Sequence, residues 1–211
     1  MATSKGTNRS MGGKVGNTVT YQLKKQTVTR SIGRITKNAT AQQMPVRQKI
    51  RIITALLKPV KDFVRIGFAE AANGTKWSAY NIASSVNNLN AIIGEGANLE
   101  INWPAVVFTK GKMPVAEDVT VQLIGDELEF SWNPQLIQRG MKDSDRVMVM
   151  AYCPAKKSAS FLFDGNRRFQ GKERLPVTRY SKKVVVHTYA AFISADRKRI
   201  SNTFYTGQFL C

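Results

Sequence analysis

The side chains that could support catalysis are few and scattered in this sequence. It contains one histidine, His187, and two cysteines, Cys153 and Cys211. A nucleophile and its base must lie within hydrogen-bond reach, and neither cysteine is close to His187 in the sequence. One histidine and two cysteines also exclude a multi-histidine metal centre, a zinc ribbon and a disulfide scaffold. We therefore expect no enzyme activity, no catalytic residue, no metal site and no cofactor.

The chemistry that the sequence favours is the binding of anions. Lys and Arg number 32 against 14 Asp and Glu, which gives a formal net charge of +18. Residues 1–61 hold 13 of these cations and no acid. Some of the cations recur on one side of a helix predicted after Pro45, within roughly 80° of one another at 100° per residue. We call the following residues the basic stripe: Arg47, Arg51, Lys58, Lys61 and Arg65.

Like charges three and four residues apart weaken an isolated helix. The basic stripe therefore carries a cost unless an anionic partner meets it. Phosphate backbones and acidic protein surfaces both fit such a face, and a solvated helix face in a basic protein is the third interpretation. No recognised nucleic-acid-binding motif is present. We assign to the same binding surface four cations from the region before the helix: Lys14, Arg30, Arg34 and Lys37.

The elements that must position these cations begin with a hairpin. Residues 1–13 are small, polar and Gly-rich, a composition typical of a flexible arm. Two runs that alternate imperfectly between apolar and polar residues, 15–23 and 26–32, predict a β-hairpin.

Two helices are expected next. Thr40 with Gln43 matches a capping box, and Pro45 is a competing helix start. Apolar residues at helical spacing continue to Phe68, and Pro59 should kink or split this helix. A second helix is expected over residues 76–93, before Gly94 and Gly96.

After Gly96 the pattern changes to strands, and 111–114 is the best candidate boundary. Turns every 8–12 residues are typical of an antiparallel sandwich. The strand candidates beyond the boundary are 119–124, 128–132, 147–152, 158–163, 168–175, 183–194 and 200–209. We predict an α+β fold, with an N-terminal β-hairpin plus two helices followed by a C-terminal antiparallel β-sandwich. Its parts are a flexible basic arm (1–13), a hairpin and helical region (14–112) and a β-sandwich domain (113–211).

Two resemblances extend this interpretation. Residues 128–134, with Trp132, and residues 189–196 with 200–202 resemble the second strand and the last hairpin of a fibronectin type III-like or immunoglobulin-like sandwich. The whole chain resembles an uncharacterised family of Bacteroidota proteins of similar length. The motifs that carry this second resemblance are 13–19, 28–31, 40–43 with Arg47, 66–68, 131–132 and 191–196. Because that family has no established function, the resemblance implies no activity.

The N-terminus, the absence of long apolar runs and the two cysteines indicate where the protein is located. The N-terminus has no apolar segment of the kind found in secretory signals, and no run of 18 apolar residues predicts a membrane span. We expect a cytoplasmic or virion-associated protein, with free Cys153 and Cys211 thiols or, alternatively, a bridge between them that ties down the C-terminal tail.

The predicted function is that of a non-enzymatic structural or assembly protein in a multimeric complex, for example a phage virion. Its basic helical face would contact acidic neighbours or nucleic acid. A hairpin followed by a Thr-x-x-Gln helix start also resembles small phage virion proteins. The expected partners are protein subunits of the same or a larger assembly, with nucleic acid as a further candidate and neither a membrane nor a small-molecule substrate. The alternative is a stand-alone protein that binds nucleic acid without sequence preference.

Overall fold

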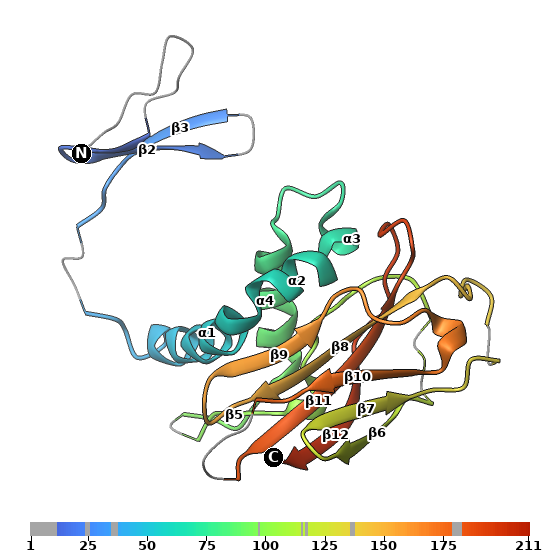
Figure 1. Ribbon diagram of the computed structural model, residues 1–211. Helices are drawn as coiled ribbons and strands as arrows, with labels where there is room; N and C mark the ends of the chain where they lie inside the picture. The colour runs from blue at the N-terminus through green and yellow to red at the C-terminus, as the bar shows by residue number, and fades with distance from the viewer. Residues whose placement is uncertain are drawn as a thin grey trace. The chain divides into compact units, whose positions relative to one another are not determined.

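The computed structural model of the protein divides into two compact units, residues 1–41 and 42–211 (Figure 1). The structure describes residues 12–23, 26–34, 38–96, 98–114, 116, 118–135, 138–178 and 183–211. The predicted arm, apart from Gly12 and Gly13, and the predicted site residue Lys37 lie outside these ranges. The α+β class is confirmed. The predicted boundary between residues 112 and 113 lies within the second unit.

The first unit contains a three-stranded antiparallel sheet, which we call the N-terminal sheet. Its order is β1 (Gly13–Val15), β2 (Thr18–Leu23) and β3 (Gln26–Ser31). Strands β2 and β3 confirm the predicted hairpin. The predicted strand over 15–23 is divided by a two-residue turn at Gly16 and Asn17. Gly16 adopts a φ of 56°, which glycine does without the steric penalty of a Cβ atom.

The second unit begins with helices α1 (Gln43–Leu57), α2 (Lys61–Gly67), α3 (Ala69–Ala72) and α4 (Ala79–Asn90). Pro59 splits the first predicted helix as expected, because it lies in a 3-10 turn, η1 (Lys58–Val60), between α1 and α2. The N-cap of α1 is Gln42, which makes no side-chain cap hydrogen bond. A helix start at Thr40 is therefore two residues too early.

The second predicted helix is shorter than expected at both ends. It starts after Ser78, whose hydroxyl accepts a hydrogen bond from the Asn81 amide at 3.2 Å. The predicted helical residues 92 and 93 instead form strand β4 (Ile92–Ile93), which pairs with β5 (Glu100–Ile101). A further 3-10 turn, η2 (Trp103–Ala105), follows. Ile92 and Ile93 are β-branched, and such residues favour a strand over a helix terminus once a second strand is available for pairing.

Two antiparallel sheets make up the rest of the second unit, in the orders β10-β7-β6 and β12-β11-β8-β9. The strands are β6 (Thr120–Ile124), β7 (Glu127–Ser131), β8 (Arg146–Cys153), β9 (Ser158–Leu162), β10 (Lys172–Pro176), β11 (Val185–Ile193) and β12 (Phe204–Leu210). Each falls on a predicted strand. The first residues of the run 168–175 form a 3-10 turn instead, η3 (Arg168–Gln170).

The four-stranded sheet is buried on both faces. Successive residues of a strand point to opposite sides of the sheet, so each strand contributes alternate residues to two cores. On β8, Val147, Val149 and Ala151 face the three-stranded sheet, in a core that includes Phe130 and Trp132. Met148, Met150 and Tyr152 belong to the other core, which they share with the helices. The second unit therefore has three layers, with α1, α2 and α4 on one face of the four-stranded sheet and the three-stranded sheet on the other (Figure 1).

A helix and a loop approach each other closely at Gly67, the last residue of α2, whose carbonyl accepts a hydrogen bond from the Lys110 amide at 2.8 Å. A Cβ atom at this position would overlap the carbonyl oxygen of Phe108 and the side chain of Thr109.

We expect Gly67→Ala to lower the free energy of unfolding by about 1–3 kcal/mol, the usual cost of overpacking. Urea denaturation would measure it. Gly33→Ala is the control, since a Cβ there meets nothing within 4 Å, and an equal effect of both substitutions would contradict the prediction.

Candidate polyanion-binding surface

The basic stripe runs along the first helices of the second unit. Arg47 and Arg51 lie on α1, Lys58 opens η1, and Lys61 and Arg65 lie on α2. All five side chains are exposed. The opposite side of the same helices carries residues that are completely buried in the core shared with the four-stranded sheet: Ile53, Leu57, Val60 and Val64. Burial of this apolar side fixes which way the cations point.

One carboxylate accompanies the basic stripe. Asp62 lies 3.7 Å from Arg65 in an exposed pair, and such surface pairs contribute at most about 1 kcal/mol. Within the described ranges, no acid forms an ion pair with the other four stripe residues. The positive charge of the stripe is therefore left almost uncompensated by this part of the chain.

The N-terminal sheet carries the remaining predicted cations that the structure describes. Lys14 is opposite Val19, which is opposite Arg30, so the two cations share one face. Tyr21 and its partner Val28 are on this face as well, since both are two residues from that row. The Arg30 guanidinium carbon lies 5.8 Å from the centroid of the Tyr21 ring, within the range of a cation–π contact.

Lys14 and Arg34 also lie around one hollow beside the β1–β2 turn. Together with Gly16, Asn17 and Ile32 they line an open hollow of about 290 Å³. Lys14 thus shares a sheet face with Arg30 and lines the same hollow as Arg34. These residues belong to the first unit and the basic stripe to the second.

A buried ion pair in the second unit was not predicted. The side chains of Arg168 and Asp145 are both only 1% exposed, with 3.8 Å between Arg168 Nε and Asp145 Oδ2. The guanidinium carbon lies 3.7 Å from the centroid of Phe192. Among the described residues nothing hydrogen-bonds to Arg168 Nε or Nη2. Burial raises the pKa of Asp145 and lowers that of Arg168, against the attraction between them, so desolvation outweighs the pairing.

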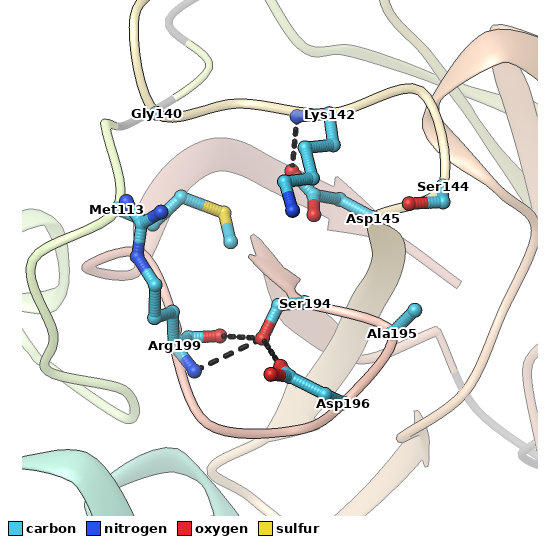
Figure 2. Close-up of a pocket in the computed structure, with 9 residues that line it drawn as sticks. All are labelled: Met113, Gly140, Lys142, Ser144, Asp145, Ser194, Ala195, Asp196 and Arg199. Carbon is cyan, nitrogen blue, oxygen red and sulfur yellow. Dashed lines mark hydrogen bonds between the residues drawn. The ribbon is translucent and has the colours of Figure 1, made fainter.

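Asp145 also forms part of the wall of a cavity of about 190 Å³ between the loop at 140–145 and the β11–β12 turn (Figure 2). Its Oδ2 accepts a hydrogen bond from the Lys142 amide at 2.7 Å. The Ser194 hydroxyl donates to Asp196 Oδ1 at 2.6 Å, and this bond lowers the pKa of Asp196. Figure 2 shows Arg199 beside Ser194, whose hydroxyl accepts a hydrogen bond from the Arg199 backbone amide at 3.0 Å. Each carboxylate of the wall is therefore held by the protein's own donors.

In this cavity the Ser194 hydroxyl is hydrogen-bonded to a carboxylate, and His187 is not among the lining residues. His187 is buried on β11, stacked on Trp103 at 4.2 Å between ring centroids. Its Nδ1 lies 3.1 Å from the Tyr205 hydroxyl. Burial lowers the pKa of His187 to about 4. At neutral pH the ring is therefore an uncharged core residue.

Three further observations bear on the class of protein. Cys153 and Cys211 are free thiols, as expected. In the described part of the chain, no three His, Cys, Asp or Glu residues are grouped as a metal site would require. Nor does that part contain a helix that is both long enough and apolar enough to span a bilayer.

Comparison with known proteins gives one match. The sequence model of a protein family described as a family of unknown function, DUF6266, aligns with residues 8–207. No curated protein and no solved structure matches the sequence. The alignment covers the N-terminal sheet, the helices that carry the basic stripe, and both sheets of the second unit up to Gly207.

Proposed function

The chain belongs to the DUF6266 family, which brings no activity with it, and we propose from its architecture that it is a non-enzymatic structural protein of a multimeric assembly. The single observation that carries the proposal is the N-terminal sheet. It has three strands, and none of the described residues of this unit is buried in a hydrophobic core. Its large apolar side chains Val15, Tyr21 and Leu23 are 55%, 37% and 56% exposed.

A small sheet of this kind is costly to maintain alone. Ordering each residue costs about 1–2 kcal/mol in backbone entropy, and a small sheet needs a hydrophobic face or packing against a helix to be stable alone. Val19, Tyr21, Val28 and Leu23 lie on one face together with Lys14 and Arg30, whereas Thr20, Gln22, Thr27 and Thr29 share the other and hydrogen-bond to one another there. We therefore assign the Tyr21 face to contact with a neighbouring subunit.

The charge of the first unit limits what else can lie beside it. Residues 1–41 contain eight Lys and Arg residues and no acid, so the assembly must bring anions close to them to offset self-repulsion. The proposal places the chain in an assembly that packages or contacts nucleic acid, such as a phage particle. In this proposal the sandwich, with its fibronectin type III-like motifs, serves as an interaction module.

Hydrogen exchange of the full chain tests this proposal. In dilute solution we expect amides of β2 and β3 to exchange on the order of 100-fold faster than those of β8 and β11, because only the latter pair has covered faces. At high protein concentration we expect exchange in β2 and β3 to slow as subunits associate.

Matched variants make the test specific to one face. Tyr21→Ser should abolish the concentration-dependent slowing. Thr29→Ser keeps the hydroxyl that bonds to Thr20 on the opposite face and should leave the slowing intact. The proposal fails if β2 and β3 are protected as strongly as β8 and β11 in the dilute chain.

A further inference from the structure

We propose that the basic stripe is a binding site for the phosphodiester backbone of nucleic acid, which it grips without reading the base sequence. This inference rests on the proposed function, because it names the anionic partner of the assembly protein.

The length and spacing of the basic stripe suit a row of phosphates. From Arg47 to Arg65 the helices advance by about 27 Å at 1.5 Å per residue, with successive cations four, seven, three and four residues apart. Each strand of a DNA duplex carries a phosphate for about every 3.4 Å of its axis. A rod of this length therefore runs past enough phosphates for every cation to find one.

The side chains between the cations also favour a phosphate backbone over a protein. The exposed residues between Arg51 and Lys58 are Thr54 and Ala55, both too small to hold an anion away from the helix. A protein partner would need a buried apolar or aromatic centre in the interface. Between Arg47 and Arg65 the one large apolar side chain that is exposed is Ile50, while Met44 and Val46 are exposed on α1 just before the stripe. Interfaces with nucleic acid are instead polar and strongly positive.

The basic stripe is also held rigid before any ligand arrives. Leu57 and Val60 on either side of Lys58, and Phe63 and Val64 between Lys61 and Arg65, are fully buried. The Phe63 ring packs edge-on against Phe161 of β9, with 5.7 Å between centroids. Because the helix axes are fixed on the sheet, phosphate binding costs only the ordering of the long cationic side chains.

The salt dependence of DNA binding by the full chain tests this inference. The probe is a 30-base-pair duplex of random sequence, titrated by fluorescence anisotropy between 50 and 200 mM KCl. Five phosphate contacts predict a slope of log K against log salt of about −4.5, or an affinity loss of about 500-fold over this range. Contacts from the N-terminal sheet would steepen it. Lys58→Gln with Lys61→Gln should make the slope shallower by about 1.8.

The matched control replaces two exposed lysines away from the helices, Lys172→Gln with Lys183→Gln, and removes the same net charge. We expect it to keep the wild-type slope. The inference is overturned if the two double variants change the slope equally. It is also overturned if the chain does not bind the duplex but binds poly-glutamate, and loses that binding when Lys58 and Lys61 are replaced. In both cases the concentration-dependent protection of β2 and β3 would still stand, so the proposed function would survive with a protein partner.

Discussion

Arg168→Met is expected to lower the free energy of unfolding by about 3–5 kcal/mol, although it introduces an apolar residue into an apolar place. The substitution leaves the Asp145 carboxylate 1% exposed and without its countercharge. The Lys142 amide still donates to this carboxylate, but a buried charge that loses its countercharge is strongly destabilising. Urea denaturation with a constant slope would report the change directly.

A second substitution separates this charge effect from a packing effect. Asp145→Asn in the Arg168→Met background removes the stranded charge and keeps an oxygen that can accept the Lys142 amide hydrogen. We expect the double variant to recover most of the lost stability, since replacing both members of a buried pair is often neutral or better. A double variant as unstable as Arg168→Met alone would show that the guanidinium acts through its packing on Phe192.

The second large effect concerns pH. Because burial lowers the pKa of His187 from 6.5 to about 4 in the folded chain, the native state binds fewer protons than the unfolded state between these values. This contribution to stability is present above pH 6.5 and is lost as the pH falls towards 4. At 1.36 kcal/mol per pKa unit the full loss is about 3 kcal/mol.

His187→Phe is the variant that isolates this contribution. A phenyl ring can keep the stack on Trp103 but cannot take up a proton, so we expect the stability of the variant to fall less between pH 7 and 4 than that of the wild type. Asp145 also has a shifted pKa. Because Asp145 is present in both proteins, its contribution to the pH dependence cancels when the two stability curves are subtracted. Tyr205→Phe, which removes the partner of His187 Nδ1, should keep the wild-type pH dependence. Parallel curves for wild type and His187→Phe would refute the account.

The elements that the sequence predicts well are those fixed by local pattern. The strands of the sandwich follow from alternation and turn spacing, and Pro59 interrupts the first helix because proline cannot donate a backbone hydrogen bond there. The end of α4 was harder to predict. Ile92 and Ile93 continue the apolar pattern of the helix but pair with β5, and only the strand that follows them in the chain decides between the two.

Long-range partners explain what could not be predicted. Arg168 and Asp145 are 23 positions apart with nothing in their local pattern to mark either as buried. His187 and Trp103 meet because the loop after β5 crosses the four-stranded sheet, where the Tyr189 hydroxyl donates to the Trp103 carbonyl at 3.0 Å. The basic stripe was predictable because one helical period sets both its own spacing and that of the buried side opposite.

The measurement that tests the central claim most directly is the mass of the purified full chain by light scattering at low salt, before and after nuclease treatment. We expect a species heavier than one chain that carries nucleic acid before treatment and loses the nucleic acid afterwards, with protein subunits still associated. A single chain free of nucleic acid under both conditions would contradict both the assembly role and the phosphate-binding stripe.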